Sequence, residues 1–111
     1  MKPTEKEEKT MKIITVCGSL RFQREMMERS EKLELEGNCV LSPVYPAREG
    51  KDAYTEAEIS MLNQMHREKI KLSDAIFVVN IGGYIGVSTK SEIEFAKSLG
   101  KEILYDTEVL E

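Results

Sequence analysis

The chain has 111 residues, of which 41% are apolar, and this is enough to build a single domain around one hydrophobic core. Its 20 acidic and 16 basic residues give a formal net charge of −4, so it lacks the positive field that attracts proteins to nucleic acid or to anionic membranes. These totals favour a small-molecule ligand, with neither a nucleic-acid polymer nor a membrane as partner.

The first residues and the cysteines indicate the compartment. Lys and Glu alternate over residues 1–11, which predicts a disordered charged tail without the apolar segment of a secretory signal. The longest apolar stretch, residues 75–79, is too short to span a bilayer. Cys17 and Cys39 lie far apart in apolar runs, which is typical of buried thiols rather than of a disulfide framework or a zinc site. We expect a cytoplasmic protein with one domain at residues 12–111.

The first half of the domain begins with a strand and a helix. Residues 13–17 are mostly β-branched and end at Gly18, which predicts a strand that is buried on both faces. A helix follows, with Ser19 as its expected N-cap and Gly37 as its C-terminal glycine. Residues 39–41 predict a second, short strand.

The second half alternates in the same way. Pro43, Pro46 and Gly50 predict a long loop of the kind that often serves as a lid. A second helix starts at Thr55 and gives way near residue 73 to a strand at 75–79. After a glycine-rich turn come a third helix at 89–99 and a strand at 103–105. The apolar stripe of the second helix contains Ile59, Leu62, His66 and Ile70.

The alternation of strands and helices predicts an α/β fold, a parallel sheet with helices on both faces in three layers, like a flavodoxin or Rossmann domain. The expected strand order is 2-1-3-4. In such sheets ligands bind beyond the carboxyl ends of the strands where the winding reverses, here between the first and third strands. The loops at residues 18–21 and 82–90 would meet there.

Both loops have features of an anion or sugar site. In the turn C-G-S-L-R, residues 17–21, the amides of the helix start point toward the crevice, although the same sequence also serves as an ordinary turn and cap. In the second loop, glycines allow close backbone approach and hydroxyls open the next helix. The candidate binding residues are Gly18, Ser19, Leu20, Arg21, Gly83, Tyr84, Gly86, Ser88 and Thr89.

Two acids follow in the third helix, and helical phase separates them. Glu92 points to the apolar face, whereas Glu94 points to the opposite, solvated side. The spacing from Thr89 to Glu92 also has the form of a capping box, in which the acid would only satisfy a backbone N–H. Glu92 is therefore a candidate catalytic acid with a structural alternative.

Three other polar residues have a structural interpretation beside a functional one. His66 lies in an apolar stripe, where a histidine is usually a hydrogen-bonded core residue, but the helix would bring it to the crevice near Glu92. A carboxylate there would raise the pKa of His66. Arg48 is a candidate phosphate clamp or a surface charge, and Asp74 is expected to be structural at the amino edge of the sheet.

Together these residues resemble the nucleoside 2-deoxyribosyltransferase superfamily, which includes the 2′-deoxynucleoside 5′-monophosphate N-glycosidases. Within it, the chain is most similar to a small branch that carries the run G-G-Y-I-G-x-S-T-x-S-E-I-E. The resemblance extends over about residues 12–105. The segment I-T-V-C-G-S-L-R is similar to the family's first strand and C-G-S turn, and E-I-E-F-A, residues 92–96, is similar to its E-x-G-x-A helix start.

The resemblance places Glu92 at the position of the family's nucleophile, and Ser19 with Arg21 where the family holds sugar or phosphate. The sequence also departs from the family. Glu94 replaces the glycine after the catalytic acid, and His66 stands at the position of the catalytic aspartate. In addition, Thr15 replaces a tyrosine of the first strand, and the fifth strand of longer relatives has no counterpart.

The resemblance implies an N-glycosidase or deoxyribosyltransferase that acts on a nucleoside or nucleotide without a metal ion or other cofactor. Glu92 would attack C1′ of the sugar, and His66 would protonate the departing base. The hydroxyls of Ser19, Ser88 and Thr89 would hold the sugar and any phosphate.

Two other functions are compatible with the same fold. The first is a non-catalytic nucleotide-binding module. The second is a flavin-binding electron carrier, which is disfavoured because Tyr84 is the only aromatic residue in the crevice loops, with Tyr45 approaching from the lid. Because the domain is short and its lid is apolar, we also expect a symmetric homodimer or higher homo-oligomer.

Overall fold

Two adjacent strands form the centre of the structure, a computed structural model in which residues 11–108 are described. Strands β1 (Ile13–Gly18) and β3 (Ala75–Val79) pair in parallel, from Ile14 opposite Ala75 to Gly18 opposite Val79. The short strand β2 (Cys39–Leu41) flanks β1, and β4 (Glu102–Tyr105) flanks β3, both in parallel. The strand order is therefore β2-β1-β3-β4, which confirms the predicted order.

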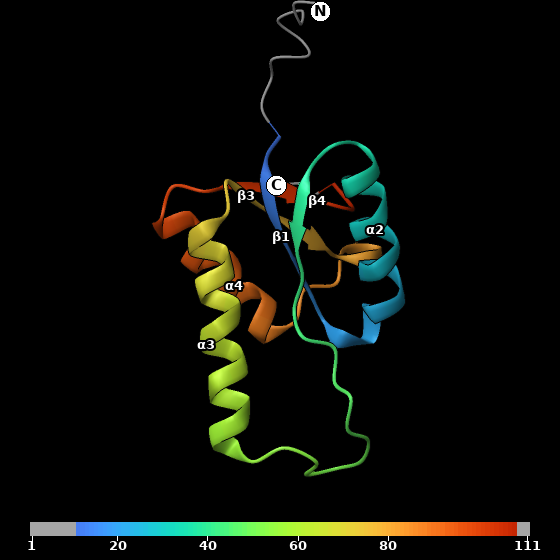
Figure 1. Cartoon of the computed structure of the whole chain (residues 1–111), viewed down its shortest axis with the longest axis vertical. Coiled ribbons are helices and arrows are strands. Elements are labelled where there is room, and N and C mark those ends of the chain that lie inside the picture. Colours follow the sequence, from blue (N-terminus) through green and yellow to red (C-terminus); the bar gives the residue numbers. More distant parts are fainter. Residues whose placement is uncertain (1–10, 109–111) are drawn as a thin grey trace, which may run out of the picture.

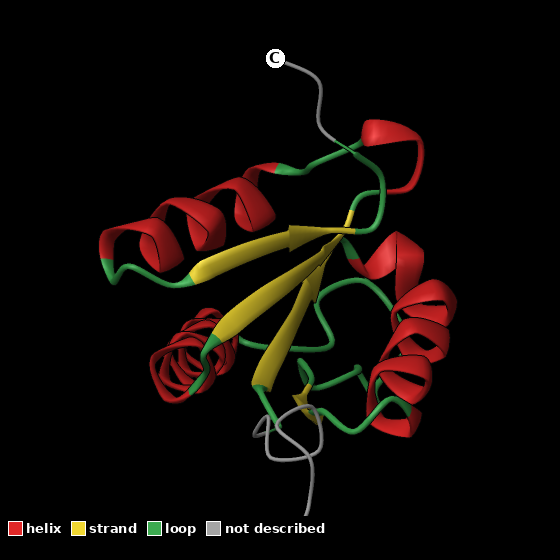
Figure 2. Ribbon diagram, turned by 90° about the horizontal axis from the view of Figure 1, so that it is seen from above, coloured by secondary structure: helices red, strands yellow, loops and turns green. Residues whose placement is uncertain are grey.

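The helices cover both faces of this sheet, as predicted (Figures 1 and 2). Helix α2 (Gln23–Leu35) packs on one face, against β1, β2 and β3. Helices α3 (Glu56–Leu72) and α4 (Val87–Ser98) pack side by side on the other face, α3 against β1 and α4 against β3 and β4. The result is the expected three-layer α/β arrangement.

The core consists of two clusters, because successive side chains of a strand point to opposite faces. On the α2 side, Val16 and Val79 pack against Met26. On the other side lie Cys17, Ile70, Ile76, Val78, Ile93 and Ala96. Cys17 thus belongs to the face that α3 and α4 cover, so its neighbours are side chains of these two helices.

The starts of two helices differ from the prediction. Ser19 caps a short 3-10 turn, Leu20–Phe22, by accepting a hydrogen bond from the Arg21 amide at 3.4 Å, and α2 begins only at Gln23. Helix α4 begins at Val87 with Gly86 as its N-cap, so Thr89 lies inside the helix and is buried. The structural alternative for Glu92, a capping box with Thr89, is therefore not formed.

A capping box forms instead at α3, where Thr55 was the predicted first residue. The Thr55 hydroxyl accepts from the Glu58 amide at 3.1 Å, and the Glu58 carboxylate accepts from the Thr55 amide at 2.9 Å. At the C-terminal end of α2, Gly37 follows the C-cap Glu36 with a φ of 98°, which glycine adopts without steric cost, so it is the glycine that ends the helix as predicted.

The predicted tail lies almost entirely outside the described residues. Of the tail predicted at residues 1–11, only Met11 is among the described residues; it is exposed and has no regular structure. Within residues 11–108, no helix combines the length and apolar character needed to cross a membrane. The cytoplasmic location and the homo-oligomer stay predictions.

Candidate functional site

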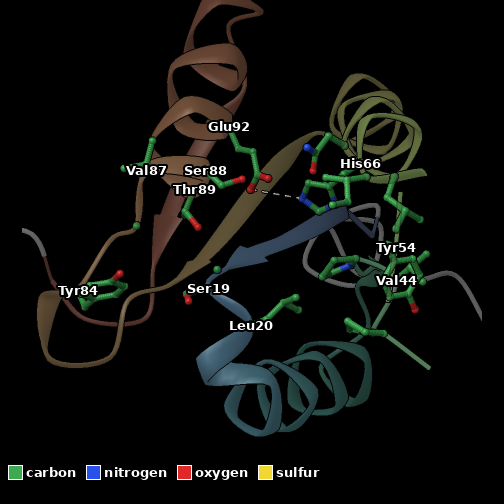
Figure 3. A pocket seen from close by; sticks show the side chains of 17 residues that line it. Ser19, Leu20, Val44, Tyr54, His66, Tyr84, Val87, Ser88, Thr89 and Glu92 are labelled. Atoms are coloured by element: carbon green, nitrogen blue, oxygen red, sulfur yellow. Dashed lines mark ion pairs between the residues drawn. The ribbon is translucent and has the colours of Figure 1, made fainter. Parts of the chain in front are cut away.

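A cavity of about 470 Å³ opens beyond the carboxyl ends of β1 and β3, where the fold predicts a ligand site (Figure 3). Its walls come from the turn after β1, the loop before α3, one side of α3 and the start of α4. The volume falls in the range of small-molecule sites. No lysine or arginine is among the residues that line it, so the wall itself carries little positive charge.

Most of the predicted binding residues line this cavity. They are Gly18, Ser19 and Leu20 from the first turn, and Tyr84, Gly86, Ser88 and Thr89 from the second. Arg21 and Gly83 do not line it. The Arg21 guanidinium lies 4.1 Å above the centre of the Tyr84 ring instead, so Arg21 contacts a residue of the wall.

The two predicted catalytic residues face each other across the cavity wall (Figure 3). Glu92 comes from the second turn of α4 and His66 from the middle of α3, and the packing of these helices brings Glu92 Oε1 within 3.6 Å of His66 Nε2. Their side chains are only 16% and 8% exposed, respectively. Glu94, by contrast, has a 68% exposed side chain beside Lys97, as its helical phase predicts.

Cys17 is the third member of this cluster. Its Sγ lies 3.4 Å from His66 Nε2, and the nearest ligand-type atoms of Cys17, His66 and Glu92 all lie within 4.8 Å of one another. Among the described residues, these side chains form the group that could hold a metal ion. His66 Nδ1 is buried and has no hydrogen-bond partner in this part of the chain, so the polar contacts of the ring are made through Nε2.

Burial changes the protonation of this cluster. It raises the pKa of Glu92 to about 7, an effect that a hydrogen bond to Cys17 and the charge of Arg67 partly oppose. Burial also lowers the pKa of His66 to about 4, and the positive charge of Lys69 acts in the same direction. The expectation that the pKa of His66 would be raised is wrong, because desolvation of the imidazolium and the charge of Lys69 both lower it. Between these two pKa values, His66 is neutral and Glu92 holds one proton.

The loop at residues 42–55 contributes to the wall of the cavity, and its role as a lid stays a prediction. Its aromatic residue at the cavity is Tyr54, whereas Tyr45 packs inward against the cluster around Val16. The Tyr54 hydroxyl accepts hydrogen bonds from the amides of Ala47 and Arg48, at 3.1 and 3.2 Å. The loop is thus tied to itself by a side chain that also faces the cavity.

Arg48 fixes this loop to α3. Its guanidinium donates to both oxygens of Glu58, at 2.9 and 3.1 Å, and lies 4.6 Å above the ring of Tyr54. These hydrogen bonds, together with that from the Thr55 amide, lower the pKa of Glu58 to about 2. The Arg48 guanidinium is therefore paired with Glu58, and Arg48 does not line the cavity. Asp74 accepts from the Ile13 amide at 2.8 Å, which is the structural role expected of it.

Part of the cavity wall was not predicted from the sequence. The length and proline content of the loop gave a signal for a lid, but nothing in the sequence showed which of its side chains turn inward. Ile59 and Leu62 were placed in the apolar stripe of α3, and a stripe does not distinguish cavity residues from core residues. The wall residues absent from the predicted site are Pro43, Val44, Pro46, Tyr54, Ile59, Leu62, Asn63 and Val87.

Comparison with known proteins bears on the fold. No protein-family model and no curated protein matches the sequence. Among solved structures, a 2-deoxyribosyltransferase from the psychrotolerant bacterium Bacillus psychrosaccharolyticus is similar with a TM-score of 0.67 and 16% identity, over 89% of this chain and 77% of that one. A conserved protein from Enterococcus faecalis V583 is similar with a TM-score of 0.61 and 22% identity, over 86% of this chain and 63% of that one. The chain therefore has a 2-deoxyribosyltransferase-like α/β fold.

Proposed function

We propose that this protein cleaves or transfers at the N-glycosidic bond of a nucleoside or nucleotide, with Glu92 as the covalent nucleophile. The observation that carries the proposal is the contact of 3.6 Å between Glu92 Oε1 and His66 Nε2 at the wall of the cavity. A carboxyl group beside a base, largely shielded from water and open to a ligand on one side, is the arrangement that covalent glycosyl transfer needs.

The proton can be followed through the reaction. The Glu92 carboxyl passes its proton to His66 Nε2, and the resulting carboxylate attacks C1′ as the bond from C1′ to the base nitrogen breaks. The electron pair of that bond leaves with the base, which takes the proton from His66. In the second step His66 takes a proton from water, the hydroxide displaces Glu92 from C1′, and the proton returns to Glu92. In a transferase, a second base replaces the water.

The walls of the cavity support a sugar near Glu92 and a base beneath the lid. The hydroxyls of Ser19, Ser88 and Thr89 lie on the side formed by the two turns. Helix α4 has no side-chain cap, so its first amides remain available for a hydroxyl or an anion. On the opposite side, Tyr54 and the aliphatic side chain of Leu62 provide a surface for a planar base.

The test incubates the protein with a panel of nucleosides and 5′-monophosphates in a buffer that contains a metal chelator. Chromatography then measures how much free base is released. We expect Glu92→Gln to abolish release, and Glu94→Gln, an exposed acid two residues away, to serve as the matched control that retains it. Rapid quenching and mass spectrometry should find a glycosyl group on the peptide that contains Glu92. Equal release by the parent protein and Glu92→Gln would refute the proposal.

The alternative is a non-catalytic binding module. It is favoured by one observation, the burial that holds His66 neutral and so leaves no cationic proton donor in the resting site. Ligands that raise the melting temperature without releasing base, in the parent protein and Glu92→Gln alike, would support the module.

A further inference from the structure

Cys17, His66 and Glu92 come from three different elements, and their ligand-type atoms converge on one point. Cys17 lies at the end of β1, His66 on α3 and Glu92 on α4. No metal site was expected here from the sequence, because the three residues are far apart in the chain and Cys17 resembled a simple core thiol. Their convergence is a property of the folded sheet with its two helices.

Two of the distances within this trio match those between the ligands of a zinc ion. With bond lengths of about 2.3 Å to sulfur and about 2.0–2.1 Å to nitrogen or oxygen, tetrahedral zinc ligands lie about 3.6 Å apart for S and N, and about 3.3 Å apart for N and O. Cys17 Sγ and His66 Nε2 are 3.4 Å apart, and His66 Nε2 and Glu92 Oε1 are 3.6 Å apart. All three atoms lie within 4.8 Å of one another.

We propose that these three atoms bind a divalent zinc ion, with the fourth coordination position open to the cavity. A thiolate and an imidazole exclude the hard cations Mg²⁺ and Ca²⁺ and favour zinc or cobalt. With the ring proton on Nδ1, the lone pair of His66 Nε2 faces Cys17 and Glu92. Binding releases two protons to solvent, one from the Cys17 thiol and one from the Glu92 carboxyl group wherever that group is protonated. His66 and Glu92 line the cavity, so water or a ligand would complete the coordination, as in catalytic zinc sites.

The proposal does not rest on the function proposed above. It is tested on the full chain, stripped with a chelator and dialysed, by titration with Zn²⁺ in a calorimeter and with Co²⁺ in a spectrophotometer. We expect one ion per chain. Bound cobalt should show the visible bands of a tetrahedral site and a near-ultraviolet charge-transfer band from the thiolate.

The variants assign the ligands. Cys17→Ala should remove the charge-transfer band and weaken zinc binding at least about tenfold, since even changes outside the ligand shell cost that much. Cys17→Ser provides a second variant in case the alanine does not fold, as judged by circular dichroism. Cys39→Ala, which removes the other free thiol, is the matched control and should change neither readout.

Several results would overturn the proposal: no zinc binding at micromolar concentrations, a charge-transfer band that persists in both Cys17 variants, or binding that is lost in Cys39→Ala. Mg²⁺ in place of Zn²⁺ should give no heat. Base release is measured separately with chelator present, so that a failure of zinc binding and a failure of base release are distinguishable.

Discussion

Replacing Glu92 by glutamine should make the free energy of unfolding depend on pH in a way that the parent protein does not show. In the folded parent, His66 releases its proton near pH 4 and Glu92 near pH 7. In the unfolded chain their ordinary values are 6.5 and 4.5, in the reverse order. Between about pH 4.5 and 6.5 the pair therefore holds one proton in both states, and its net contribution to the pH dependence is close to zero.

Glu92→Gln leaves His66 without this compensation. Because the pKa of His66 is lowered from 6.5 to about 4 by folding, the unfolded variant binds more protons in that window. The stabilising contribution is thus complete above pH 6.5 and is lost as the pH falls toward 4. The displacement corresponds to up to about 3 kcal/mol.

His66→Gln should show the opposite slope. It leaves Glu92, whose pKa is raised from 4.5 to about 7, so the contribution is complete below pH 4.5 and is lost as the pH rises through 7. The expected loss is again up to about 3 kcal/mol. Because a small domain has a total stability of only about 5–15 kcal/mol, both effects are large.

The assay is urea unfolding, monitored by circular dichroism. It is repeated at pH values from 4.5 to 7.5 with a metal chelator present. Subtracting the parent curve from each variant removes the contribution of groups that all three proteins share, such as Glu58. Two difference curves of opposite slope are expected. Difference curves that are both flat would show that neither Glu92 nor His66 is desolvated enough to shift its pKa, and the account of the site's protonation would fail.

Three further predictions concern the framework of the site. Thr55→Ala removes the cap of α3 and should cost about 1 kcal/mol in urea unfolding; an unchanged midpoint would contradict a stabilising cap. Gly18→Ala places a Cβ 3.0 Å from Met26 Sδ and should cost about 1–3 kcal/mol in the same assay, and a neutral result would mean that the neighbours move freely. Tyr54→Phe removes the acceptor that ties the lid, so trypsin should cut after Arg48 faster at an unchanged melting temperature. An unchanged cutting rate would show that other contacts hold the loop.

The sheet could be predicted because its signals are local. The β-branched runs at β1 and β3 and the alternation with helices determine a parallel sheet, and right-handed connections leave few strand orders. Helical phase gave the inward direction of Glu92 and the outward direction of Glu94. Helical phase depends on the helix alone, so the prediction of which side chains share a face holds whatever the helix packs against.

The features that were missed depend on contacts between elements. The start of α4 was placed at Thr89 because that residue is a good cap, whereas the backbone extends through Gly86 and enters the helix directly. Tyr45 was expected at the cavity, but Tyr54 lines it instead. A proline-containing loop has no periodic pattern from which the direction of a side chain can be inferred. The lowered pKa of His66 follows from its depth in the fold, which an apolar stripe only suggests.

Cys17 shows how one unrecognised neighbour changes the chemistry of a site. If Cys17 were only a core thiol, Glu92 and His66 would form a pair that can transfer a proton between its two members. At 3.4 Å from His66 Nε2, it makes the pair a trio with the donor set of a zinc site. A bound zinc ion would draw electron density from the Glu92 carboxylate and weaken it as a nucleophile, so the two proposed uses of Glu92 exclude each other at any one time. Base release that is lost with zinc and regained with chelator would reveal that competition directly.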